Sequence, residues 1–179
     1  LIFRMQLGFP EESLTWIKPL LGKWIVVNDA GIGSLDQDFY YALVTMHGTI
    51  LVFFVLTAGL SGTFSNLLIP LQIGARDMAS PFLNMLSYWF FFRAGAIMFS
   101  SLFLNTGPFA GGWTAYPPLS ALPQAMSGSG AGMTLWSLSL VFFVVSVLLG
   151  GMNYITTVLN LRTKGMTMWR LPLTVWAFL

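Results

Sequence analysis

Three long runs of apolar residues dominate the chain, and shorter polar or turn-rich segments separate them. The runs predict helices over 39–71, 81–104 and 131–161. A helix needs about 20 mostly apolar residues to cross the hydrocarbon core of a bilayer, and each run reaches that length. Helices buried in a soluble core usually stop sooner, so the pattern predicts three membrane-spanning helices.

Shorter apolar runs lie at both ends of the chain. Residues 1–8 fit the last turns of one helix, and residues 171–179 fit the first turns of another. The longer and more polar segment 9–38 precedes the first complete run. We therefore predict an all-α fold, a polytopic transmembrane helix bundle that forms a single membrane domain, and we expect it to be a fragment of a longer membrane protein.

The composition supports a membrane setting. Apolar residues make up 56% of the chain and charged residues 8%, whereas a soluble domain carries about 25% charged residues. The absence of cysteine excludes a disulfide scaffold, a cysteine zinc site and a thiolate-bound iron–sulfur cluster. A net charge of +2 is too small to indicate binding of nucleic acid, and lipids are the expected surroundings.

The charges of the connecting segments predict the orientation. Segment 162–170 carries three basic residues and no acid, whereas 8–38 carries five acids against two lysines. Basic loops mark the inner side of a membrane. Alternating helices then place 72–80 and 162–170 inside. They place the outer segment (9–38) and the outer loop (105–132) on the other side.

His47 is the only histidine, and it lies inside the first predicted spanning helix. Polar side chains at that depth are costly and are candidates for function. One reading is a structural histidine hydrogen-bonded between helices. The other is an axial ligand of a haem iron, because one histidine cannot build a zinc site but can supply one axial bond. Gly48 beside it would leave room for a flat ring.

Two further candidates lie toward the outer side. Arg4 sits near the outer end of the first helical piece and either snorkels to lipid headgroups or donates to a polar group of a buried ligand. Trp113 lies in the outer loop and is either an interfacial anchor or an indole N–H donor to a ligand carboxylate.

A third group of polar residues gathers toward the inner side. Asp77 follows the first spanning helix and either pairs with the arginine before it or opens a proton path. Asn66 and Asn84 lie near it at two helix ends, and Ser146 and Asn153 lie two turns apart on the third helix. Together they would hold a file of water; the alternative for each is an interhelical hydrogen bond.

Arg93 lies near the middle of the second predicted helix. An arginine at that depth needs a partner, a wet cavity or a local defect in the bilayer. No acid of this sequence is placed to pair with it, and the pattern does not explain it.

Several strings of the sequence resemble one known family, subunit I of the haem–copper terminal oxidases, and among them most closely the bacterial cytochrome c oxidases. They are VTMHGT at 44–49, SNLLIPLQIGARDMA at 65–79, LSYW at 86–89, GWTAYPPL at 112–119, GGMN at 150–153 and GMTMWRLPL at 165–173. The resemblance implies a twelve-helix subunit, of which this chain covers the end of helix 1 to the start of helix 5.

The resemblance also implies roles for the outer candidates. His47 matches the histidine that is one axial ligand of the low-spin haem, which is expected to be haem a. Arg4 matches the arginine that bonds the formyl group of that haem. Trp113 matches the tryptophan beside the haem propionates.

On the inner side, Asp77 matches the acid at the mouth of the family's proton channel. Asn66 and Asn84 match the asparagines of that channel, and Ser146 and Asn153 match polar residues higher in it. Two departures stand out: Gln6 replaces a glutamate that helps to bind a structural cation, and the outer segment is longer than usual.

The implied activity is cytochrome c oxidation coupled to proton translocation. Electrons would pass through the low-spin haem to an oxygen-reducing centre of a second haem and copper, whose ligands lie outside this fragment. Expected partners are a copper-bearing subunit II, cytochrome c and a supercomplex with a quinol-oxidising complex. The expected location is the bacterial cytoplasmic membrane rather than the mitochondrial inner membrane. The alternatives are a quinol oxidase of the same family and a cofactor-free transporter or channel segment.

Overall fold

The computed structural model describes residues 2–11 and 13–179. Leu1, assigned to the first helical piece, and Glu12, an acid of the outer segment, lie outside the described residues. The described residues include three helices long and apolar enough to cross a membrane: Gln37–Ile73, Pro81–Phe103 and Ala131–Leu161. The predicted transmembrane helix-bundle fold is confirmed.

The chain folds as two compact units. Leu1–Gly48 and Ser101–Thr134 form the first unit, and Thr49–Ser100 and Leu135–Leu179 form the second. The first unit holds the outer segment, the beginning of the first spanning helix and the outer loop. The second unit holds most of the spanning helices and the two inner loops.

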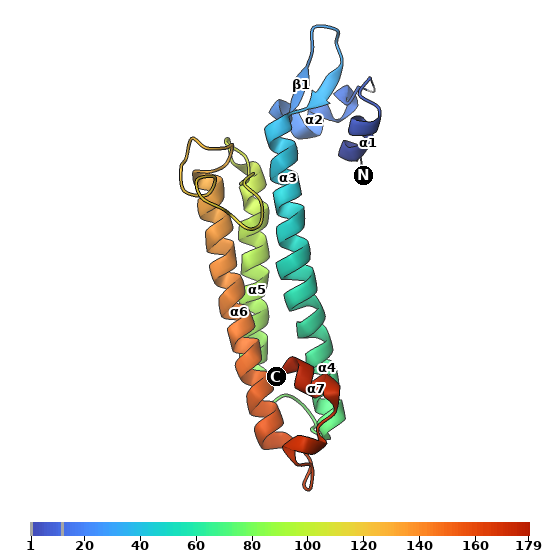
Figure 1. The fold of residues 1–179 in the computed structure, drawn as a ribbon, viewed down its shortest axis with the longest axis vertical. Coiled ribbons are helices and arrows are strands. Elements are labelled where there is room, and N and C mark those ends of the chain that lie inside the picture. Colours follow the sequence, from blue (N-terminus) through green and yellow to red (C-terminus); the bar gives the residue numbers. More distant parts are fainter. Residues whose placement is uncertain (1, 12) are drawn as a thin grey trace. The chain divides into compact units, whose positions relative to one another are not determined.

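The first spanning helix is continuous but changes its winding. It consists of α3 (Gln37–Thr49), the π-helical stretch η3 (Ile50–Leu60) and α4 (Ser61–Ile73) (Figure 1). Long π-helical stretches are rare. The apolar pattern does not separate them from ordinary α-helix.

Capping residues set the ends of this helix. The Asp36 side chain accepts a hydrogen bond from the Phe39 backbone N–H at 3.0 Å, which satisfies one donor of the first turn. At the other end Gly74 adopts a left-handed conformation with φ of 75° and closes the helix. The helix therefore extends two residues beyond each end of the predicted range 39–71.

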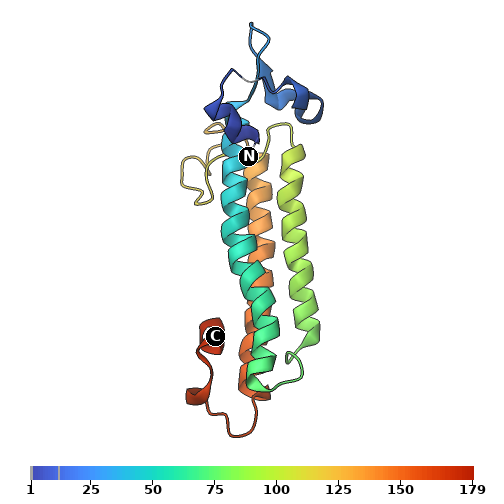
Figure 2. The ribbon, with the colours of Figure 1, turned by 90° about the vertical axis from the view of Figure 1, so that its right-hand side faces the viewer.

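The remaining helices of the described chain follow in order: α5 (Pro81–Ser100), the short turn η4 (Ser101–Phe103), α6 (Ala131–Leu161), η5 (Met168–Arg170) and α7 (Leu173–Phe178). In the second unit α4, α5 and α6 run side by side, and α7 packs against α4 (Figures 1 and 2).

Aromatic and aliphatic contacts hold the second unit together. The ring of Phe54 on η3 lies 5.5 Å from the rings of both Phe91 on α5 and Phe143 on α6. A second cluster joins α4, α6 and α7, and it consists of Ile69, Ile73, Val158, Leu171 and Val175. Between helices in a bilayer such contacts act through close packing rather than through release of water.

The outer segment carries secondary structure that the hydropathy pattern did not indicate. After α1 (Ile2–Gly8) come η1 (Thr15–Ile17), α2 (Lys18–Leu21), η2 (Gly22–Trp24), β1 (Ile25–Val27) and β2 (Gly33–Leu35). The two strands form an antiparallel hairpin in which Ile25 pairs with Leu35. Strands of three residues are too short to show an alternating pattern.

Trp24 joins the outer segment to its neighbours in the first unit. Its ring stacks on Phe39 of α3 with centroids 4.4 Å apart. The ammonium group of Lys23 lies over the Trp24 ring and donates to the backbone carbonyl of Asn105. A Cβ on Gly107 would come within 2.7 Å of Trp24 Cη2. The outer loop therefore approaches Trp24 so closely that only glycine fits at position 107.

We predict that Gly107→Ala destabilises the full-length protein by about 3 kcal/mol. A left-handed alanine costs about 1–2 kcal/mol, and the clash with Trp24 adds strain of about 1–3 kcal/mol. The thermal unfolding midpoint of the detergent-purified protein measures the effect.

Gly31→Ala is the matched control. Gly31 has φ of 77°, close to the 76° of Gly107, but no atom lies within 4 Å of the place that a Cβ on Gly31 would take. It should show the backbone cost alone. Equal midpoints for the two variants would contradict the proposed fit of Trp24 against Gly107.

Candidate functional site

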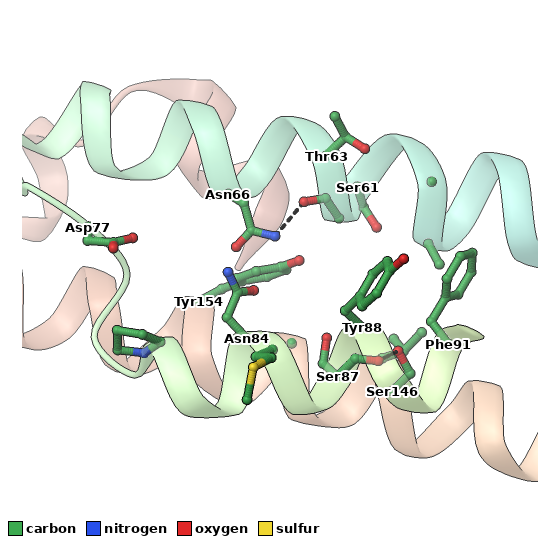
Figure 3. Close-up of a pocket in the computed structure, with 17 residues that line it drawn as sticks. Ser61, Thr63, Asn66, Asp77, Asn84, Ser87, Tyr88, Phe91, Ser146 and Tyr154 are labelled. Carbon is green, nitrogen blue, oxygen red and sulfur yellow. Dashed lines mark hydrogen bonds between the residues drawn. The ribbon is translucent and has the colours of Figure 1, made fainter. Parts of the chain in front are cut away.

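A pocket of about 600 Å³ opens between α4, α5 and α6 in the second unit (Figure 3). Four of the five residues predicted for the proton path line it, namely Asp77, Asn66, Asn84 and Ser146. They come from α4, the inner loop after it, α5 and α6. The fold thus gathers side chains that are up to 80 positions apart in the sequence around one space.

Asn66 presents a buried acceptor to this pocket. Its Nδ2 donates to the Gly62 carbonyl at 2.6 Å, and its Oδ1 is buried with no hydrogen-bond partner among the described residues. Figure 3 shows Asn84 facing it from α5. A buried acceptor left unpaired costs about 1–3 kcal/mol. A water molecule held between the two amides would remove that cost.

Asp77 lies at the inner end of the pocket, in the loop between α4 and α5. Its side chain is exposed, and Oδ1 accepts the Met78 backbone N–H at 2.7 Å. Within the described chain Asp77 forms no ion pair with Arg76, although the two are adjacent. The carboxylate is therefore open to solvent at the mouth of a polar pocket.

Ser146 fits both readings of the sequence. Its side chain is 5% exposed, and Oγ donates to the Ser87 carbonyl of α5 at 2.7 Å. This is the interhelical hydrogen bond of the structural reading. Ser146 also lines the pocket, and a hydroxyl that donates one hydrogen bond keeps lone pairs that can accept another from water.

Asn153 stands apart from the other four predicted residues. It is fully buried and does not line the pocket. Its Oδ1 accepts the Ser80 backbone N–H at 2.9 Å, and its Nδ2 donates to the Ser80 carbonyl at 3.1 Å. Both ends of the amide bind the start of α5 to α6, which is the interhelical hydrogen bonding of the structural reading, and the place of Asn153 in the proton path stays a prediction.

The pocket also contains residues that the sequence reasoning overlooked. Ser87, Tyr88 and Phe91 of α5 line it together with Asn84. Their spacing of three and four residues places them on one face of a helix. That spacing is the sequence signal that could have identified these residues as neighbours of Asn84. Tyr154 of α6 also lines the pocket and offered no such pattern.

Trp113 occupies the space that Gly48 was expected to leave for a flat ligand. Trp113 Cδ1 lies 3.2 Å from the position of a Cβ on Gly48. The Gly112 backbone N–H donates to Thr45 Oγ1 at 2.9 Å and fixes the outer loop on α3. The absence of a side chain at Gly48 therefore admits the Trp113 indole, and the expected role of Gly48 beside a haem stays a prediction.

His47, the candidate axial ligand of a haem, lies on α3 in the first unit. The His47 side chain is exposed on α3, and within the described ranges it forms no hydrogen bond. No group of three or more metal-ligating side chains occurs there either. The imidazole is thus free to bind one iron, as a haem ligand would.

Arg4 and Gln6, both on α1, differ in their hydrogen bonding. Arg4 is exposed on α1 and bonds to no other residue in the described part of the chain. Gln6 Oε1 accepts the Leu35 backbone N–H at 3.0 Å and ties α1 to the hairpin. The described contact of Gln6 is therefore one that serves the fold.

Arg93 is exposed on α5, and no hydrogen bond or ion pair joins it to another described residue. Nothing in the structure explains an arginine at this depth.

The comparison with known proteins agrees with the strings found in the sequence. All 179 residues match the family described as Cytochrome C and Quinol oxidase polypeptide I. The chain belongs to the haem–copper oxidase subunit I family. With three helices able to span a bilayer, this oxidase chain is an integral membrane protein.

Relatives of this oxidase chain include both electron-donor types. It is 42% identical over 175 residues to alternative cytochrome c oxidase subunit 1 of Bradyrhizobium diazoefficiens. The matched region covers 98% of the chain and 26% of that relative. It is 41% identical over 145 residues to quinol oxidase subunit 1 of Bacillus subtilis. The matched region covers 81% of the chain and 22% of that relative. The chain spans about a quarter of these relatives.

We predict that Asn153→Ala destabilises the full-length oxidase by about 2 kcal/mol. The change leaves the part-buried Ser80 N–H without its acceptor and removes one of the two donors to the Ser80 carbonyl, which keeps the Asn84 backbone N–H. Thermal unfolding in detergent measures the loss.

The matched control is Asn160→Ala, since Asn160 is exposed on the same helix; it should leave the midpoint nearly unchanged. A normal midpoint for Asn153→Ala together with a large loss of turnover would instead support a place for Asn153 in the proton path.

Proposed function

We propose that this chain is part of subunit I of a cytochrome c oxidase, and that the pocket behind Asp77 is its proton inlet. The observation that carries the proposal is the pocket itself. It brings an exposed carboxylate, the two asparagines and Ser146 around one space in a chain of this family. The coupled reaction would be electron transfer to oxygen with proton translocation across the bacterial cytoplasmic membrane.

The inlet would work through the chemistry of its side chains. The Asp77 carboxylate is exposed and collects protons from the inner aqueous phase. Asn66 and Asn84 orient water behind it, because an amide both donates and accepts hydrogen bonds. Ordered water bridges such groups at little cost. Ser146 offers the next acceptor on α6.

The electron path would use residues of the first unit. His47 would supply an axial nitrogen to a low-spin haem, expected to be haem a, and Arg4 and Trp113 would donate to its polar edge. When bound, that haem accepts and passes on single electrons. The second haem and copper would be held by residues outside this chain. Expected partners are a copper-bearing subunit II, cytochrome c and a supercomplex with a quinol-oxidising complex.

A quinol oxidase is the second candidate. The observation in its favour is the Bacillus subtilis quinol oxidase, which is 41% identical against 42% for the Bradyrhizobium relative. Gly112, Trp113 and Thr114 favour the cytochrome c branch by resemblance. Oxygen consumption by the purified complex with reduced cytochrome c, and separately with a quinol, decides between them. Family membership argues against the cofactor-free transporter.

We predict that Asp77→Asn in the full-length oxidase lowers oxygen consumption at least tenfold, about 1.4 kcal/mol on the limiting barrier. The amide keeps the shape but cannot collect a proton. The visible haem spectrum should stay unchanged, because Asp77 belongs to the second unit and His47 to the first.

Asp29→Asn serves as the control, since Asp29 is an exposed acid of the outer segment. It should keep full turnover. Near-normal oxygen consumption by Asp77→Asn would defeat the inlet proposal.

We also predict that His47→Ala abolishes the low-spin haem signal or prevents assembly of the oxidase. The change removes one of two axial bonds, and the chain contains no other histidine. The reduced-minus-oxidised visible spectrum of the membranes is the measurement. A normal low-spin spectrum in this variant would remove His47 from the ligand assignment.

A further inference from the structure

Tyr154 reaches the proton pocket from α6, next to Asn153, whose amide binds Ser80. Its ring packs against the apolar cluster that joins α4, α6 and α7. Its side chain nevertheless lines the pocket. Figure 3 shows it extending from α6 toward the space between α4 and α5. An aromatic ring with an apolar body and a polar tip suits such a boundary.

Gly150 opens a space between the Tyr154 hydroxyl and a serine. Gly150 lies one turn before Tyr154 on α6. A Cβ at Gly150 would lie 3.5 Å from Tyr154 Oη and 3.9 Å from Ser87 Oγ. Both hydroxyl oxygens therefore lie within 4 Å of one point above the glycine. Gly150, Tyr154 and Ser87 all line the pocket of about 600 Å³, which has room for a water molecule between the two hydroxyl groups.

The Tyr154 hydroxyl forms no hydrogen bond with the residues that the structure describes. Its oxygen is not one of the buried unpaired atoms of the described residues, so it is open to the pocket that the side chain lines. A water molecule on each side of Oη would satisfy it as donor and as acceptor. On one side lies the Oδ1 of Asn66, also unpaired among the described residues, in the wall of the same pocket.

We propose that the Tyr154 hydroxyl relays protons between the asparagine pair and the serines of this pocket, a proposal that rests on the inlet function of Asp77. An amide can orient water but does not pass on a proton, whereas a hydroxyl does both. The order of groups would be Asp77, water at the asparagines, Tyr154, water over Gly150, and Ser87.

The transfer is balanced at Oη. A hydronium on the asparagine side loses a proton, and a new O–H bond forms at Oη. The original phenolic O–H bond breaks at the same time, and its proton passes to the water over Gly150. The phenol is neutral before and after the step, so no oxidant, reductant or further base is needed.

The test uses the full-length oxidase with Tyr154→Phe, which keeps the ring and its packing and removes only the hydroxyl. We expect turnover to fall about fivefold, the rate equivalent of one lost hydrogen bond. The ratio of turnover in H₂O to that in D₂O should rise, because proton delivery becomes limiting. A merely structural role would not change this isotope ratio. Tyr116→Phe, at an exposed tyrosine of the outer loop, is the matched control.

Gly150→Ala provides a second variant in case Tyr154→Phe fails to assemble. The added methyl group makes only ordinary contacts with the two hydroxyls and narrows the pocket space where the proposed water would lie. Alanine also favours the helix more than glycine does. We therefore expect slower turnover and a raised isotope ratio without loss of thermal stability. A structural defect would lower stability and turnover together.

Asp77→Asn is measured in parallel to separate the two proposals. One outcome is slow turnover in Asp77→Asn, with normal turnover and a normal isotope ratio in both Tyr154→Phe and Gly150→Ala. This outcome would overturn the relay and leave the inlet intact. Normal turnover in Asp77→Asn would overturn the inlet and the relay with it. Slow turnover and a raised isotope ratio in all three variants would support the relay.

Discussion

A polar group inside a bilayer finds no water in the hydrocarbon, so the protein or enclosed water must satisfy it. This requirement accounts for most polar side chains on the spanning helices. Ser139 and Ser146 donate to carbonyls of α5, and Thr57 donates to a carbonyl of its own helix. Among the described residues, Asn66 and Gln72 keep a buried side-chain oxygen unpaired. Only Asn66 lines the large pocket, and there an unpaired acceptor is an advantage, because a water path needs groups that the fold has not already satisfied.

The two kinds of chemistry proposed for this chain are carried by different units. The histidine, arginine and tryptophan assigned to the haem lie in the unit built around the outer segment and the outer loop. The carboxylate and amides of the inlet lie in the unit built from α4, α5 and α6. The proposal thus predicts that mutations in one unit alter electron chemistry without altering proton delivery, and the reverse for the other unit.

Hydropathy predicted the three spanning helices because their length and composition leave few alternatives. It could not predict the ends, which depend on Asp36 and Gly74 as capping residues. Nor could it separate Asn66 from Asn153, two asparagines in apolar helices, since only the packed structure shows which amide is consumed by a backbone partner. The space beside Gly48 posed the same difficulty, because Trp113, 65 positions later, fills it. Local pattern defines elements, but long-range contacts decide which polar atoms remain available.

The inner loop that carries Asp77 is held at both of its ends by α6 and the residues that follow it. Thr163 donates its backbone N–H to the Ile73 carbonyl at 2.9 Å, and Thr157 Oγ1 accepts the Ala79 backbone N–H at 2.9 Å. Only five residues, 74–78, lie between these anchors. A segment so short and so tightly tied has little freedom for the slow opening and closing that gate many active sites. In the proposed inlet, the Asp77 carboxylate would thus keep a fixed position, and the rate of its proton uptake would follow diffusion in the adjoining water rather than any motion of the backbone.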